Sequence, residues 1–329
     1  MHVIRIATFT GPEGLRVDQA EAPTPGPEEI AVTVYASALN RADLVQSQGR
    51  YPAPPGVAAD IPGLEYAGVV AAVGARVRRW KVGDRVMGLV GGGAWAEVVV
   101  THELEALPIP ARWSFHQAAA APEAFSTAYD ALVRQAGVTV GSRVLIHAAA
   151  SGVGTAAAQI CRVFGGRAIG TGRSEAKLAR VQPLGFDAII HTGAGPVFAE
   201  RVRELTGGRG VDVVLDLIGG DSVTESVEAM APGGILVLVG LVAGSSATLP
   251  LGKVLMKRLQ LRGTTLRSRP LDEKIQLARN VEKQLLPSFE SGALMPIIDE
   301  VVPMHDVATA LERLSRNETV GKVVLAWSP

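Results

Sequence analysis

The chain is poor in cysteine and has no surplus of either charge. Its single cysteine, Cys161, excludes an intrachain disulfide and fits a reducing cytoplasm. Lysine and arginine total 32, as do aspartate and glutamate, so the charge balance does not indicate a nucleic-acid or membrane partner. One cysteine and six scattered histidines give no metal-ligand spacing, and we expect no metal site. His147 ends a buried strand and is expected in the core.

Long apolar runs and a leader segment are also missing. The longest apolar stretch covers only residues 233–244, whereas a membrane-spanning helix needs roughly 20 residues. The first residues lack the basic region and long apolar run of a signal peptide. We therefore expect a cytoplasmic protein, and 329 residues, of which 47% are hydrophobic, are enough for two domains.

A turn of small residues in the middle of the chain predicts a phosphate-binding site. Val144–His147 is typical of a buried strand, Ala148–Gly154 of a tight turn and Thr155–Phe164 of a helix. Small residues let the backbone approach a pyrophosphate, and the helix start offers free N–H groups and a positive dipole end. The turn residues expected to bind a dinucleotide are Ser151, Gly152, Val153 and Gly154.

Strands and helices alternate from this turn onward, which is typical of a doubly wound parallel sheet. The first third of the chain is instead rich in short strands separated by Gly and Pro, and the last part of the sequence resembles the first third again. The predicted fold class is α/β, with the parallel sheet inserted into a β-rich domain. The expected bounds are 1–122 with 267–329 for the β-rich domain and 123–266 for the nucleotide-binding domain. The strands expected in the sheet are Val144–His147, Arg167–Thr171, Ala188–Ile190, Val211–Asp216 and Ile235–Val239, and Leu259–Thr265 can add a sixth at the edge.

The end of the second strand favours NADPH over NADH. NAD sites usually carry an acid there, about 20 residues after the turn, for the ribose 2′-hydroxyl. This chain has Gly172, Arg173 and Ser174 instead, with Lys177 one helical turn later. A 2′-phosphate would meet two cations and a hydroxyl, unless both cations are solvated surface charges.

Loops after the later strands should complete the cofactor site, because the carboxyl ends of parallel strands face the ligand in such sheets. The residues expected there are Leu217 and Gly219 after the fourth strand and Val239, Gly240 and Leu241 after the fifth.

Motifs spread in order along the whole chain resemble one enzyme family. They are Asn40–Leu44, Gln48–Pro52, Pro62–Val70, Gly83–Val86, Phe125–Ala128, Asp216–Gly220, Leu266–Arg269 and Gly321–Val324. On these motifs the chain resembles the zinc-free quinone oxidoreductases, the zeta-crystallin-like branch of the medium-chain dehydrogenase/reductases, and is most similar to the tumour-suppressor-inducible type. The resemblance implies a GroES-like catalytic domain, a Rossmann domain that binds NADPH, and a homodimer joined through the Rossmann domains.

The resemblance also implies catalytic residues. Asn40 and Tyr51 match positions at the nicotinamide and in the substrate pocket, and Thr127 matches a position near the nicotinamide. The residues alone leave two alternatives open: Asn40 is also a typical helix N-cap, and Tyr51 can be a packing residue of a Pro-rich loop.

The remaining cofactor residues rest on the same resemblance. His191, Thr192 and Leu266 are expected at the cofactor, although relatives carry a tyrosine beside the 2′-phosphate where this chain has Thr192. Asn40 and Leu64 stand at the positions of two zinc ligands in zinc-dependent relatives, so the resemblance implies no metal. Arg267 and its neighbour Arg269 are either surface charges or phosphate ligands.

The expected reaction is hydride transfer from NADPH to a quinone. The protein need only align the acceptor, exclude water and stabilise developing oxyanion charge. Reduction of the activated C=C bond of an enal or enone suits the same pocket, and one-electron and two-electron products both remain open. An NADPH-binding structural or RNA-binding protein is the alternative of another class, which the neutral charge and the lack of aromatic platforms disfavour.

Overall fold

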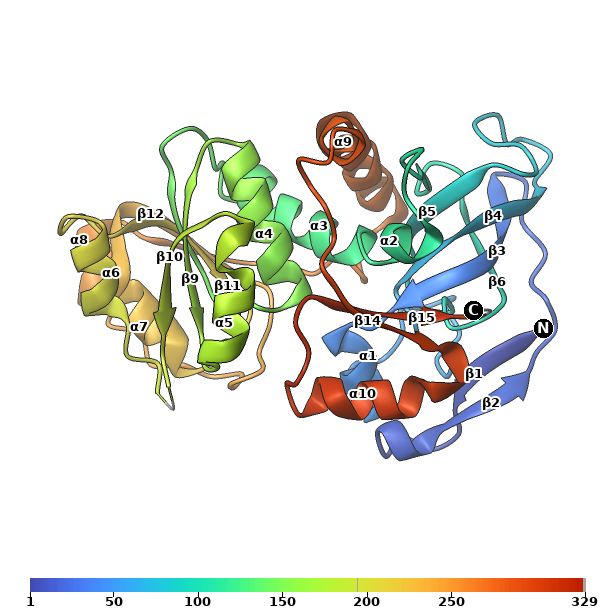
Figure 1. The fold of residues 1–329 in the computed structure, drawn as a ribbon, viewed down its shortest axis with the longest axis horizontal. Helices are drawn as coiled ribbons and strands as arrows, with labels where there is room; N and C mark the ends of the chain where they lie inside the picture. Colours follow the sequence, from blue (N-terminus) through green and yellow to red (C-terminus); the bar gives the residue numbers. More distant parts are fainter. Residues whose placement is uncertain (194, 328–329) are drawn as a thin grey trace. The chain divides into compact units, whose positions relative to one another are not determined.

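The structure, a computed structural model, describes residues 1–193 and 195–327. The chain divides into two compact units (Figure 1). Unit 1 combines Met1–Ser126 with the chain from Leu266 onward, and unit 2 is Thr127–Thr265. Unit 2 is therefore an insertion in the sequence of unit 1. The chain passes from unit 1 to unit 2 between Ser126 and Thr127, inside helix α3 (Pro122–Tyr129). The boundary expected from the sequence, at residue 122, lies at the start of this helix.

Unit 2 is built on six parallel strands in the order β10-β9-β8-β11-β12-β13. All the predicted strands are present, and the sixth lies at the edge of the sheet, as expected. Their alternation with helices confirms the α/β class. The strands are β8 (Arg143–Ile146), β9 (Arg167–Gly172), β10 (Phe186–His191), β11 (Val211–Asp216), β12 (Met230–Leu238) and β13 (Gln260–Gly263).

Helices cover both faces of this sheet, which confirms the doubly wound arrangement. Figure 1 shows α4 and α5 on one side of the strands and α6 and α7 on the other. The order of the strands reverses between β8 and β11, and ligands of such sheets bind at this switch point. The helices are α4 (Gly152–Val163), α5 (Glu175–Val181), α6 (Ala199–Leu205), α7 (Asp221–Ala229) and α8 (Leu251–Lys257).

The helix expected at 125–135 continues as a wider π-helix over Asp130–Gln135. Asp130 is buried, and its carboxylate accepts hydrogen bonds from Gln135 at 2.8 Å and from Thr264 at 2.9 Å. The five-residue spacing from Asp130 to Gln135 matches the wider turn. The carboxylate thus joins the segment that enters unit 2 to the segment that leaves it.

His147 lies in the core of unit 2, as the sequence predicts. Its side chain is fully buried, and its two ring nitrogens each lie 2.8 Å from a hydroxyl, of Thr171 and of Ser226. Burial lowers the pKa of His147, so the neutral ring is favoured. Both nitrogens are satisfied, and the histidine has a structural role.

Unit 1 is rich in antiparallel strands around its long strand β3 (Glu29–Ala38). The first half of β3 pairs with β6 and the second half with β15, near the end of the chain. In Figure 1 the blue β3 and the red β15 accordingly lie side by side. A separate hairpin is formed by β1 (His2–Ile6) and β2 (Leu15–Gln19). The other strands are β4 (Glu65–Val73), β5 (Arg85–Leu89), β6 (Val98–His102), β7 (Leu107–Pro108), β14 (Ile298–Pro303) and β15 (Lys322–Ala326).

Four further helices belong to unit 1. They are α1 (Arg41–Ser47), α2 (Phe115–Ala119), α9 (Leu271–Glu290) and α10 (Val307–Ser315). One core cluster joins residues from both parts of the sequence, with Ile4 and Leu44 packed together with Leu311 and Leu325. The two separate stretches of sequence therefore share one hydrophobic core.

Candidate functional site

The turn after β8 has the geometry of a phosphate-binding loop. Ala148 adopts a positive φ of 49°, and its carbonyl accepts a hydrogen bond from the N–H of Ser151 at 2.8 Å. The hydroxyl of Ser151 accepts from the N–H of Gly154 at 3.0 Å and caps α4, which therefore begins earlier than predicted. A Cβ on Gly154 would lie 2.5 Å from the carbonyl oxygen of Ala148, so only glycine fits the turn.

The start of α4 leaves donors for a ligand. Within the described part of the chain, the backbone N–H groups of Gly152 and Val153 have no hydrogen-bond acceptor. They stand in the first turn of a 12-residue helix, where the helix dipole also favours an anion. The residues present therefore fit the pyrophosphate of a dinucleotide.

Two other predicted loops lie in contact at the same edge of the sheet. Asp216, the last residue of β11, accepts the N–H of Gly219 on its carboxylate at 2.9 Å and the N–H of Val239 on its carbonyl at 2.8 Å. A Cβ on Gly240 would lie 2.5 Å from the carbonyl oxygen of Leu217. The structure thus brings the loops after β11 and β12 together, with Leu241 more than half exposed beside them.

The ends of β9 and β10 are also joined. Thr192 donates its backbone N–H at 2.9 Å and its hydroxyl at 3.2 Å to the carbonyl of Gly172. The Nε2 of His191 lies 3.0 Å from the carbonyl oxygen of Arg173. His191 and Thr192 therefore support the segment in which the 2′-phosphate is expected.

The charge pattern of that segment is basic. Arg173 is exposed, Ser174 caps α5 by accepting the N–H of Lys177 at 3.4 Å, and Lys177 is half-buried. The strand end carries no carboxylate before Glu175. The segment lacks the acid that usually binds a ribose 2′-hydroxyl.

In unit 1, Asn40 precedes α1, and a buried ion pair holds its side-chain amide. Its Nδ2 donates to Glu65 Oε1 at 2.9 Å, and its Oδ1 accepts from Lys322 Nζ at 2.6 Å. Lys322 and Glu65 also bond directly at 2.6 Å, and they are 4% and 0% exposed. The amide is therefore fixed at both ends by two charged residues.

Asp43 completes the start of α1. Its carboxylate accepts the backbone N–H of Asn40 at 2.7 Å and that of Gly63 at 3.2 Å. Burial raises the pKa of Asp43 to about 7, while the two N–H donors and Lys322 favour its ionised form. Asp43 thus holds the backbone of Asn40, as the ion pair holds its side chain.

Tyr51 lies in a loop that Arg267 fixes. The guanidinium lies 5.0 Å from the Tyr51 ring centroid, and it donates to the carbonyls of Gly91 at 2.6 Å and Tyr51 at 3.2 Å and to the amide of Gln46 at 2.7 Å. Arg267 is 6% exposed, so its interpretation as a surface charge is wrong. Burial raises the pKa of the Tyr51 phenol, and Arg267 opposes this shift. The phenol is therefore protonated at neutral pH.

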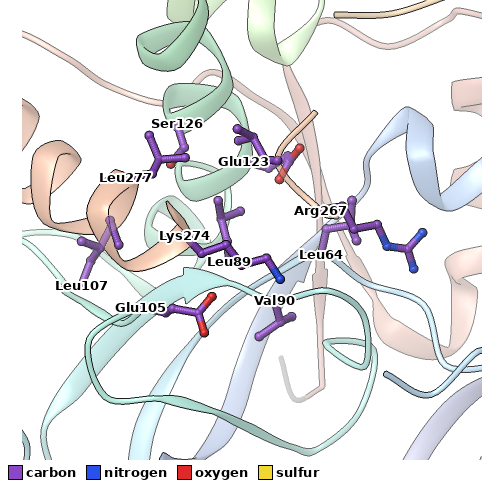
Figure 2. Close-up of a pocket in the computed structure, with 12 residues that line it drawn as sticks. Leu64, Leu89, Val90, Glu105, Leu107, Glu123, Ser126, Arg267, Lys274 and Leu277 are labelled. Atoms are coloured by element: carbon purple, nitrogen blue, oxygen red, sulfur yellow. The ribbon is translucent and has the colours of Figure 1, made fainter. Parts of the chain in front are cut away.

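A pocket opens in unit 1 (Figure 2). Asn40 and Tyr51 do not line this pocket. Two of its lining residues are close to them: Leu64 precedes Glu65, which binds Asn40, and Arg267 lies over the ring of Tyr51. Leu266, expected at the cofactor, lines this pocket. Its apolar walls are Leu64, Leu89, Val90, Leu107, Leu266, Leu277 and Ala278, and its polar lining is Glu105, Glu123, Ser126, Arg267 and Lys274.

In residues 1–193 and 195–327, no group of three His, Cys, Asp or Glu side chains is arranged to hold a metal ion. The helices in the same ranges are all too short or too polar to span a bilayer.

Comparison with protein families identifies both parts of the chain. Residues 26–111 match the alcohol dehydrogenase GroES-like domain, and residues 152–283 match the zinc-binding dehydrogenase model. The quinone oxidoreductase of Lama guanicoe is 31% identical over 99% of this chain and 97% of its own length. A quinone oxidoreductase-like protein 2 homolog of Nematostella vectensis is 32% identical over 91% of this chain and 82% of its own.

Solved structures of related proteins match this chain over nearly its whole length. A Pseudomonas syringae quinone oxidoreductase has a TM-score of 0.88 at 34% identity, covering 99% of both chains. An NAD-dependent alcohol dehydrogenase has a TM-score of 0.88 at 33% identity over 100% of both chains. The JamJ enoyl reductase has a TM-score of 0.88 at 26% identity, over 99% of this chain and 98% of its own. This chain therefore belongs to the medium-chain dehydrogenase/reductase superfamily of oxidoreductases.

Proposed function

We propose that this protein is a cytoplasmic, NADPH-dependent reductase of quinones that works without zinc. The observation that carries the proposal is the pocket of unit 1, whose walls are largely apolar and suit a flat conjugated carbonyl compound. A relative that matches 99% of the chain is named a quinone oxidoreductase, which supports this acceptor class. Asn40 and Leu64, at the positions of two zinc ligands in zinc-dependent relatives, support metal independence.

NADPH, when bound, supplies the hydride. The free N–H groups of Gly152 and Val153 bind its pyrophosphate in this proposal. Arg173, Ser174 and Lys177 bind the 2′-phosphate. The loops that contain Leu217, Gly219, Val239, Gly240 and Leu241, together with Thr127 and Leu266, complete the cofactor site.

The residues of unit 1 bind and orient the acceptor. The leucines of the pocket exclude water, which strengthens every polar interaction inside it. Arg267 fixes the loop of Tyr51, whose protonated phenol is a hydrogen-bond donor for a carbonyl oxygen. The amide of Asn40 is held in one orientation by Glu65 and Lys322.

An acceptor panel tests the function. The purified protein is expected to oxidise NADPH with 1,2- or 1,4-quinones faster than with alkenals, and equally well with and without EDTA. The measurement is the loss of NADPH absorbance. Loss of turnover after dialysis against EDTA would contradict metal independence, and NADPH binding without turnover of any acceptor would indicate a structural or RNA-binding role instead.

Reduction of activated C=C bonds is the second candidate. The JamJ enoyl reductase, which shares the fold over nearly the full length, supports it. Quinones, enals and enones are all conjugated carbonyl compounds, so the same apolar pocket suits them. Faster turnover of alkenals than of quinones in the panel would favour this candidate.

We further propose a homodimer joined through unit 2. Strand β13 is exposed along its length at the sheet edge, where its backbone groups can pair with a second copy. Three neighbouring apolar side chains of α8, Leu251, Leu255 and Met256, are 71%, 75% and 77% exposed. Sedimentation is expected to give the mass of two chains.

A charge on α8 should disrupt this dimer. Leu255→Glu buries a carboxylate in the proposed interface and is expected to give monomers at concentrations where the wild type is dimeric. Val140→Glu is the matched control, because Val140 is equally apolar and 82% exposed but lies outside α8 and β13. A monomeric wild type, or equal effects of both substitutions, would refute the proposed interface.

A further inference from the structure

The pocket of unit 1 contains one pair of opposite charges that no other group neutralises. Lys274 projects into it from α9 and Glu105 from the loop between β6 and β7 (Figure 2). Within the described residues, neither side chain makes a hydrogen bond or an ion pair. Arg267, in contrast, already donates to three oxygens of unit 1. The pair is therefore available to a ligand.

The surroundings of Glu105 favour its protonated form near neutral pH. Burial raises the pKa of Glu105 to about 7, Lys274 opposes this shift, and Glu29 adds to it. Burial raises the pKa of the neighbouring Tyr66 phenol, and the charge on Glu105 raises it further. A carboxyl group in this state can both donate and recover a proton under physiological conditions.

Lys274 and Glu105 line the same pocket, and both are open to a ligand bound in it. They influence each other electrostatically, but within the described residues no ion pair joins them. A carbonyl oxygen has two lone pairs and can accept one hydrogen bond from an ammonium group and one from a carboxylic acid. A carboxylate ligand would repel Glu105 in its ionised form, whereas a neutral carbonyl would not.

We propose, on the basis of the proposed quinone reduction, that Lys274 and Glu105 bind one carbonyl oxygen of the acceptor and complete its reduction. Hydride transfer to the other carbonyl oxygen adds two electrons and one hydrogen and leaves a negative charge on the bound oxygen. Lys274 stabilises that charge, and Glu105 transfers its proton to the oxygen, which yields the hydroquinone. Two O–H bonds form, while the C–H bond of the hydride donor, the O–H bond of Glu105 and the π component of both C=O bonds break; solvent then returns a proton to Glu105.

Two variants test the two roles separately. Lys274→Met keeps the length of the side chain but removes its charge, and it is expected to weaken binding of 1,4-naphthoquinone about 10- to 100-fold. Glu105→Gln can still donate a hydrogen bond but cannot release a proton, and it is expected to lower kcat about 100-fold near pH 6. The rate of the wild type should fall as the pH rises through about 7 and Glu105 loses its proton; the Gln variant should lack this fall.

Binding is measured without turnover, by quenching of tryptophan fluorescence with 1,4-naphthoquinone. Lys283→Met and Glu290→Gln are matched controls, because both residues are exposed on α9 and do not line the pocket. All four variants should keep the NADPH dissociation constant and the melting temperature of the wild type. Lys274→Arg, which keeps the positive charge, should restore part of the quinone affinity.

The outcomes separate this inference from the function on which it rests. An active wild type whose Lys274 and Glu105 variants match the controls in quinone affinity, kcat and pH profile would overturn the inference alone. A wild type that reduces no quinone would overturn the proposed function, whatever the variants bind. A loss of activity that follows the melting temperature would mean that the pair is structural, which also overturns the inference.

Discussion

Replacing Lys322 by methionine is expected to lower the free energy of unfolding of unit 1 by about 3–5 kcal/mol. Lys322 is 4% exposed and bonds to Glu65, to the carbonyl of Leu39 and to the amide of Asn40. The substitution leaves the fully buried carboxylate of Glu65 without a counter-charge, and desolvating an unpaired charge is costly. The same change frees the Oδ1 of Asn40, so catalysis should fall together with stability.

The tryptophans allow this effect to be measured in unit 1 alone. The sequence has four, Trp80, Trp95, Trp113 and Trp327, and all of them belong to unit 1. Urea denaturation followed by tryptophan fluorescence therefore reports on the unit that contains the ion pair.

Two further variants control the result. Arg76→Met removes an exposed partner of Glu28 in unit 1 and should cost no more than about 1 kcal/mol. Combining Lys322→Met with Glu65→Gln removes both charges and should restore much of the lost stability. A single Lys322 variant as stable as the Arg76 variant would show that the buried pair contributes little.

The second large effect is expected for Lys177→Ala, which should raise the KM for NADPH about 10- to 100-fold and leave the KM for NADH nearly unchanged. A hydrogen bond to a charged group contributes roughly 1.5–3 kcal/mol, and only NADPH carries the 2′-phosphate that Lys177 is proposed to bind. The measurement is initial-rate kinetics with each nucleotide at a saturating concentration of one quinone.

Arg180→Ala is the matched control for this prediction. It removes one positive charge from the same helix, α5, at an exposed position farther from the start of the helix. A long-range effect of charge would appear in both variants, whereas a direct phosphate contact would appear only in the Lys177 variant. Equal changes in the KM values for NADPH and NADH would reject the assignment of this residue.

The fold of unit 2 could be predicted because its signals are local. Each buried strand is a short apolar run, and the turn from Ala148 to Gly154 joins one of them to a helix in the order that parallel sheets require. The pairing in unit 1 could not be predicted in the same way. Strand β15 pairs with β3 from the far end of the chain, and local patterns carry no information on such partners.

The same contrast between local signals and distant partners applies to the candidate site. The loops after β8, β9, β10, β11 and β12 were expected to meet, because the carboxyl ends of parallel strands share one edge. The ion pair of Glu65 and Lys322 was missed although both residues lie in the quoted motifs, since nothing in a sequence shows that two distant charges are buried together. Arg267 was ambiguous for the same reason, because its acceptors lie 176 to 221 residues away in the sequence.

Because β3 pairs with β15, unit 1 cannot complete its sheet until late in synthesis. During synthesis, the second half of β3 leaves the ribosome with one edge open and keeps it open while all of unit 2 is translated. Unit 2, a continuous stretch of chain, can fold in that interval. The inserted part can therefore finish first, whereas the lobe begun earliest stays open until β15 has been translated.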